Sequence, residues 1–114
     1  MVLLIEGMNK IRDLLNTNLT KGQNGTGTST VNENDTGLEV ADASTLKTLS
    51  NNIGDRILTT THTLVTTDAN GDALTEFENQ FSSGESLIRI RHTPISKDNS
   101  KEITFIMTYE ILSE

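Results

Sequence analysis

The chain has 114 residues, a formal net charge of −7 and no cysteine. This length suits one domain, and the acidity argues against DNA, RNA or an anionic membrane surface as a partner. The lack of cysteine excludes a disulfide scaffold and a cysteine-ligated zinc site. Hydrophobic residues make up 33% of the sequence and aromatic residues 4%, so we expect a thin aliphatic core and some further apolar burial against a partner.

The N-terminal region predicts an amphipathic helix over residues 3–19. Leu4, Met8, Ile11 and Leu15 recur at spacings of three and four, which places them on one helix face. That face either covers the sheet or reaches a neighbouring subunit. The apolar run at residues 2–5 is too short for a signal peptide or a membrane span, so we expect a protein made and used without export.

A polar stretch rich in Gly, Asn and Thr follows at residues 20–37. It predicts a long surface segment, which is either a docking element or a plain connector. Its glycines lack the Gly-Lys-Ser/Thr ending of a phosphate-binding loop. The triplet Asp35-Thr36-Gly37 also occurs in aspartic proteases, but the apolar strand around such a site is missing, so a capped turn is the favoured interpretation.

The rest of the chain predicts antiparallel strands separated by turns. A short strand and a turn are expected within residues 38–50, followed by a turn at residues 51–55. Alternating polar and apolar residues predict longer strands over residues 56–66, 73–81, 86–93 and 101–112. The Asn70-Gly71 pair is a hairpin signal between the first two of these strands.

The last predicted strand has the most regular alternation in the sequence. Its apolar residues fall at every second position and share one face: Ile103, Phe105, Met107, Tyr109 and Ile111. We therefore expect the remaining strands to be laid against it. The pattern as a whole predicts a mainly β fold, an antiparallel β-sandwich or meander with one N-terminal α-helix.

The sequence pattern divides the chain into three parts. The helix takes residues 1–21, an extended Gly/Asn/Thr-rich segment takes residues 22–37, and the antiparallel β domain takes residues 38–114. It predicts that the β domain folds without the residues before Gly22.

Two polar sets contain the residue types of metal or catalytic sites. Asp68, Asn70 and Asp72 alternate like the first ligands of a calcium loop, but the glycine and glutamate that such a loop needs later are absent. His62 and His92 lie on two predicted strands and could form a metal or acid–base cluster with Glu76 or Glu78, but solvated or hydrogen-bonded histidines are the simpler interpretation. We predict no metal, no cofactor, no catalytic residue and no enzymatic activity.

Arg89 and Arg91 project from the same face of one predicted strand. Cross-strand Glu76 or Glu78 is a suitable ion-pair partner for either arginine. The pair is open to two interpretations, a solvated salt-bridge ladder or a subunit-interface patch that meets an acidic neighbour.

Several short motifs occur in a recognisable order along most of the chain. They are Gly25-Thr26-Gly27-Thr28, Asp35-Thr36-Gly37-Leu38-Glu39, the Asn70-Gly71 turn leading into Thr75-Glu76, the turn before Lys97, and the final strand. This order, from about Asn9 onward, resembles small virion structural proteins of tailed bacterial and archaeal viruses.

The resemblance implies a non-enzymatic tail, fibre, baseplate or capsid-surface protein, assembled in the host cytoplasm and located in the virion. It implies homo-oligomers, often trimers, and contacts with other virion proteins, without nucleic acid or membrane. The alternative is a receptor- or glycan-binding module at a virion tip. The candidate assembly residues are Leu4, Met8, Ile11, Leu15, Gly25, Thr26, Gly27, Thr28, Arg89 and Arg91.

Overall fold

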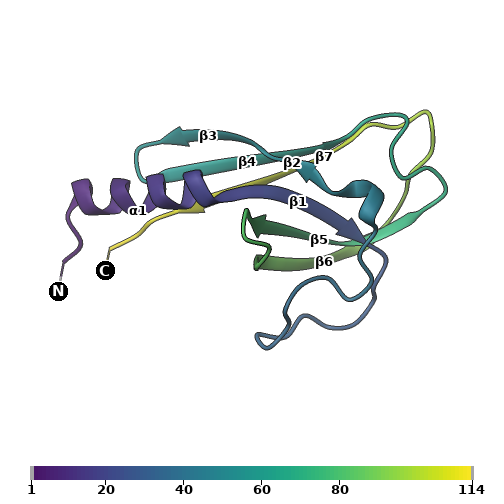
Figure 1. The fold of residues 1–114 in the computed structure, drawn as a ribbon, viewed down its shortest axis with the longest axis horizontal. Coiled ribbons are helices and arrows are strands. Elements are labelled where there is room, and N and C mark those ends of the chain that lie inside the picture. Colours follow the sequence, from purple (N-terminus) through teal and green to yellow (C-terminus); the bar gives the residue numbers. More distant parts are fainter. Residues whose placement is uncertain (1, 114) are drawn as a thin grey trace.

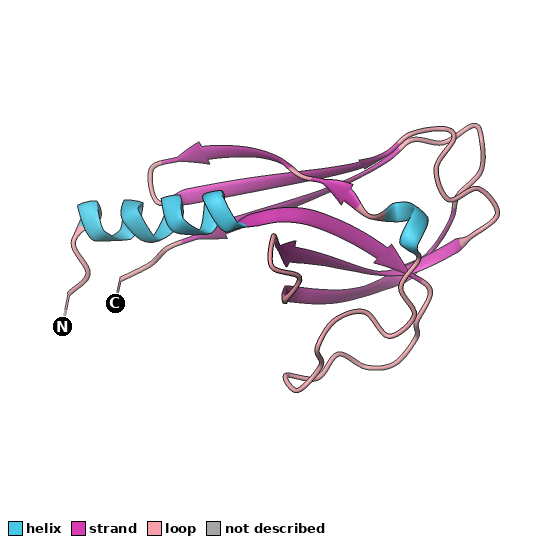
Figure 2. Ribbon diagram, viewed as in Figure 1, coloured by secondary structure: helices cyan, strands magenta, loops and turns pink. Residues whose placement is uncertain are grey.

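The structure is a computed structural model that describes residues 2–113, and this part of the chain forms one α-helix and two antiparallel sheets (Figures 1 and 2). The elements are α1 (Ile5–Asn18), β1 (Leu19–Gly25), the 3-10 turn η1 (Ala43–Thr45), β2 (Lys47–Thr48), β3 (Ser50–Gly54), β4 (Ile57–Leu64), β5 (Ala73–Phe81), β6 (Ser86–Ser96) and β7 (Ile103–Glu110). The predicted fold class, a mainly β antiparallel sandwich with one N-terminal helix, is confirmed.

The two sheets pack face to face. One has four strands in the order β2-β1-β5-β6, and the other has three in the order β3-β4-β7. Aromatic rings join the layers, because Phe77 on β5 stacks on Phe105 of β7 at 4.7 Å and lies edge-on to His62 of β4 at 5.2 Å. The inner strands are β1 and β5 in the first sheet and β4 in the second.

The core between the sheets is small and partly polar. Leu19, Leu49 and Leu58 form its buried aliphatic cluster. Further along, the Asn79 amide donates to the hydroxyl oxygens of Thr60 at 2.9 Å and Tyr109 at 2.6 Å. Buried polar groups that find such partners cost little stability and fix one arrangement of the sheets.

β1 corrects the prediction that the chain is irregular from residue 20. Leu19–Gly25 is an inner strand, paired with β2 on one side and β5 on the other. Gly22 allows this, because a Cβ at that position would lie 2.7 Å from His62 Cδ2. Leu19 is fully buried. The division at residues 22 and 38 therefore does not match the fold, and deletion of the residues before Gly22 would remove part of the core.

The strand order also differs from a simple meander. The turn at Asn70-Gly71 is present, with Gly71 at φ +93°, but it carries the chain from one sheet to the other, since β4 and β5 do not pair. The turn predicted at residues 51–55 is mostly strand β3. β7 has the predicted alternation, yet it is an edge strand that pairs, among residues 2–113, with β4 alone.

No helix in the described chain has the length and apolar character needed to cross a membrane.

Candidate assembly surfaces

A long loop, residues 26–42, covers the outer face of the four-stranded sheet and is held there by Glu76. This carboxylate is fully buried on β5. It accepts hydrogen bonds from the backbone N–H groups of Gly27 at 2.7 Å, Glu39 at 2.9 Å and Val40 at 2.9 Å. Because both ends of the loop bond to one side chain, Glu76 closes the loop onto the sheet.

Arg89 completes this clamp from β6. Its guanidinium donates to Glu76 at 2.8 Å, to Asp35 at 3.0 Å and to the Ser29 carbonyl at 3.1 Å, and the side chain is 4% exposed. Burial alone would raise the pKa of Glu76, but the surrounding N–H groups and the guanidinium outweigh it and hold that pKa below its usual value. The clamp is thus an ionised cluster satisfied inside the chain.

One side of the sandwich is open. β6 and β7 are the last strands of their sheets and lie next to each other, with the rings of His92 and Phe105 5.6 Å apart. Within residues 2–113, neither strand has a partner on its outer edge. The apolar side chains between these edges are all only half-buried: Ile88, Ile90, Ile103, Phe105, Met107 and Tyr109.

The β7 edge also lacks the usual protection against pairing. Its eight residues include no proline and no lysine, and its register with β4 runs from Leu64↔Ile103 to Ile57↔Glu110 without a bulge. Natural edge strands commonly carry one of these devices to prevent contact with other chains. β7 is therefore a ready contact for another strand or sheet, while β6 carries Pro94 near its end.

The α1 helix exposes a second apolar surface. Met8 is buried and Leu15 packs on the core cluster, so this part of the apolar stripe covers the sheets as predicted. The rest of the stripe faces solvent, with Leu4 72%, Ile11 43% and Leu14 53% exposed. One face of the helix therefore covers the sheets, and the other face is free to reach a neighbouring subunit.

Polar contacts fix α1 against the turn between β3 and β4. Asn9 accepts a hydrogen bond from the Arg56 backbone N–H at 2.7 Å and donates to Asp55 at 3.1 Å, and Arg12 donates to the Gly54 carbonyl. The first turn of α1 extends past the strands at the end of the molecule where both termini lie (Figure 1). The exposed apolar face is thus held in a fixed orientation.

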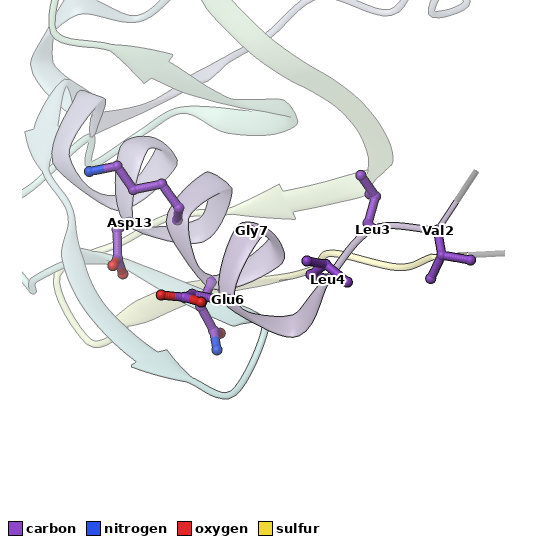
Figure 3. Close-up of a pocket in the computed structure, with 8 residues that line it drawn as sticks. Val2, Leu3, Leu4, Glu6, Gly7 and Asp13 are labelled. Atoms are coloured by element: carbon purple, nitrogen blue, oxygen red, sulfur yellow. The ribbon is translucent and has the colours of Figure 1, made fainter.

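The hollow beside the first turns of α1 is wide and open (Figure 3). Its volume is about 680 Å³, and its lining combines the apolar Val2, Leu3 and Leu4 with the charged Glu6, Lys10 and Asp13. Such a shallow surface on a single helix lacks the enclosing walls of a small-molecule site. It is better suited to contact with another protein surface.

The residues weighed for metal binding are engaged elsewhere. Asp68 accepts from Lys47 at 2.9 Å and Asn70 from Lys97 at 3.0 Å, so lysines occupy the positions where a cation would sit. His62 is buried between the sheets, whereas Glu76 lies on the outer face. Among the described residues, no three His, Cys, Asp or Glu side chains form a metal-binding group.

The structure separates the predicted assembly residues into two groups. Met8, Gly25 and Gly27 are buried, Leu15 packs against the core, and Arg89 belongs to the clamp, so these five are used inside the chain. Leu4, Ile11, Thr26, Thr28 and Arg91 are exposed. The predicted pair of Arg89 with a cross-strand glutamate is present, with Glu76 as the partner.

The roles of two residues in these surfaces, Glu76 and Leu14, were not predicted from the sequence. The clamp role of Glu76 depends on a distant loop, and the sequence indicated only that Glu76 or Glu78 could pair with an arginine of the neighbouring strand. The exposure of Leu14 was easier to predict from the sequence. With Leu4, Ile11 and Leu15 it makes the apolar stripe of α1 wider than one contact face requires. The aromatic side chains Phe77, Phe81, Phe105 and Tyr109 are buried or half-buried, so they offer no exposed platform for a glycan.

No protein-family model matches this chain, and neither the curated proteins nor the solved structures contain a significant match.

Proposed function

We propose that this chain is a non-enzymatic structural protein that acts by assembling with copies of itself, and that it is a component of a tailed virus particle. The observation that supports assembly is the open side of the sandwich. There, two neighbouring edge strands, β6 and β7, frame a row of half-buried apolar side chains. Burying such a row against a second copy would gain about 25 cal/mol per Å² of apolar area.

The virion assignment has a different support, the order of motifs shared with small virion proteins. In the structure these motifs lie in parts of the chain that build the clamp and its surroundings. Gly27 and Glu39 bond to Glu76, and Lys97 is buried in the turn region beside Asn70. The motifs are therefore explained as fold-forming residues, which is compatible with a structural protein whose working surfaces lie elsewhere.

Self-assembly is tested with the purified full chain by sedimentation velocity. Met107→Lys places an inward-pointing charge on the open side, and we expect it to lower the association state while the far-UV circular dichroism remains unchanged. Ile106→Lys is the matched control, because this neighbour on β7 points to the outer face and is 63% exposed. A wild-type chain that is monomeric at all concentrations would contradict self-assembly.

The virion assignment is tested by immunogold electron microscopy and mass spectrometry of purified particles. Label on the capsid would assign a head-surface position, and label on the tail would assign a tail, fibre or baseplate position. Absence of the protein from disrupted particles would refute the virion part of the proposal and leave self-assembly intact.

A further inference from the structure

We propose that the exposed face of α1 pairs with α1 of a second copy in an antiparallel arrangement about a two-fold axis. This inference rests on the proposed self-assembly and names one of its surfaces and its partner. The surface consists of Leu4, Gly7, Ile11 and Leu14. It is distinct from the open side of the sandwich, since neither β6 nor β7 contributes to it.

The spacing of these four residues is that of a helix–helix seam. Leu4 is the N-cap residue of α1, and Gly7, Ile11 and Leu14 follow it at intervals of three, four and three residues, which is the repeat that keeps side chains along one line of contact between two helices. All four are exposed, and a Cβ at Gly7 would meet nothing within 4 Å. The inward-facing positions of the same helix, the buried Met8 and the half-buried Leu15, lie to one side of this line.

An antiparallel pairing matches large side chains to each other and to the gap at Gly7. With the two-fold axis level with residue 9, Leu4 of one copy lies level with Leu14 of the other. Gly7 then lies level with Ile11 of the second copy, so the glycine receives a bulky side chain. A parallel pairing would instead place Gly7 beside Gly7 and leave a void in the seam, which costs stability.

The charges beside the seam favour the same arrangement. Glu6 and Lys10 lie along the polar flank of the seam, and neither has an ion-pair partner in the described chain. In an antiparallel pair the same flanks of the two helices meet. Lys10 of one copy is then within about two residues, roughly 3 Å along the axis, of Glu6 of the other. The two-fold axis repeats this contact, which gives two opposite-charge pairs.

The surroundings of α1 have room for a partner helix. Its C-terminal half forms one wall of a groove of about 450 Å³, with Phe81 and Ser83 on the other wall. In the antiparallel pair, Leu4 of the second copy enters this groove next to Leu14. Because α1 extends past the strands at one end of the molecule, the two sandwiches are placed at opposite ends of the helix pair (Figure 1).

Disulfide trapping tests the arrangement directly, because the natural chain has no cysteine. Leu4→Cys and Leu14→Cys are prepared separately, mixed and oxidised, and the products are identified by mass spectrometry. We expect the mixed Leu4→Cys with Leu14→Cys disulfide to exceed each like-with-like disulfide at least fivefold. A majority of like-with-like disulfides would indicate a parallel bundle and would overturn the proposal. So would trapping no faster than that of Val40→Cys, an equally exposed control position at 51%.

A charge exchange provides a second, independent measurement. Lys10→Glu is expected to weaken the association measured by sedimentation about tenfold, and the double variant Glu6→Lys/Lys10→Glu is expected to restore it. Both residues are exposed, so the fold is not at risk. Equal association of all three proteins would overturn the pairing.

The two proposals fail in different ways. If the mixed disulfide between Leu4→Cys and Leu14→Cys does not form but Met107→Lys still lowers the association state, the helix pairing is refuted and self-assembly through the open side stands. If the mixed disulfide forms as expected but the protein is absent from disrupted particles, the helix pairing stands and the virion assignment is refuted.

Discussion

The two long sides of this sandwich are closed by different means. On one side the chain passes directly from β2 to β3 through Leu49, which is buried beside Leu19 and Leu58. The sheets are therefore joined covalently and by packing at that corner. On the other side β6 and β7 are the last strands of their sheets and are joined only at one end, by the loop of residues 97–102, and Met107 between them is only half-buried.

This difference shows how a chain with few apolar residues distributes them between its two sides. Three of its buried leucines, Leu19, Leu49 and Leu58, form the cluster that holds the two sheets together at the closed corner. The apolar residues of the open side add less to the stability of one copy, because each keeps part of its surface in water. They gain most when a second copy covers them.

The largest effect is expected from Glu76→Gln, which tests whether charge holds the loop onto the outer face beside the open-side strand β6. The change leaves the guanidinium of Arg89, on β6, without its buried partner. We expect a loss of about 3–5 kcal/mol in the free energy of unfolding, measured by urea denaturation. Glu39→Gln, at an exposed carboxylate of the loop that Glu76 holds, should cost much less. Equal losses would mean that Glu76 is not the clamp.

Paired alanine substitutions compare the two sides directly. Leu58→Ala on the closed side is expected to cost about 2–5 kcal/mol, because the side chain is 1% exposed and leaves a cavity. Met107→Ala on the open side should cost less than half of that at low protein concentration, by the same denaturation assay. Equal costs in the monomer would show that the open side is as well packed as the closed one.

Acid should weaken the contact between the layers through His62. Burial lowers the pKa of this histidine, so it stays neutral in the folded protein, while the unfolded chain takes up a proton below about 6.5. The unfolded state then binds more protons, and the free energy of unfolding falls as the pH is lowered through and below that value. Denaturation midpoints between pH 7.5 and 5 measure the slope, which should be absent in a folded His62→Gln variant.

The smallest effect is expected from Ile106→Thr, on the outer face of β7. Ile106 is 63% exposed and points away from the row that the open side presents. Stability should change by no more than about 0.5 kcal/mol, and the sedimentation profile should not change. A lower association state would extend the open-side contact to the outer face of the sheet.

The strands with strong alternation could be predicted from the sequence. β4, β5, β6 and β7 begin and end close to their predicted bounds, because alternation and half-burial coincide in them. β1 could not be predicted, since Thr20 to Gly25 contains no apolar residue. It is a strand because its backbone fills the space between β2 and β5, where Gly22 allows close approach to His62.

The candidate surfaces were only partly predictable for a related reason. The sequence identified the apolar stripe of α1, but the division into a buried and an exposed half depends on how the helix meets the turn at Gly54 to Arg56. The open side depends on strand order. A hairpin at Asn70-Gly71 would have placed β4 beside β5, and only the crossing between sheets leaves both β6 and β7 at free edges.

The direct join between α1 and β1 has a mechanical consequence. The helix ends at Asn18 and the strand begins at Leu19, so no flexible linker separates them. A pull on the helix is transmitted into a strand that is hydrogen-bonded on both sides. Because β1 lies antiparallel to β2 and β5, such a force would load the hydrogen bonds of both ladders in shear at once. A tether at this end of the molecule would therefore resist tension with many bonds together.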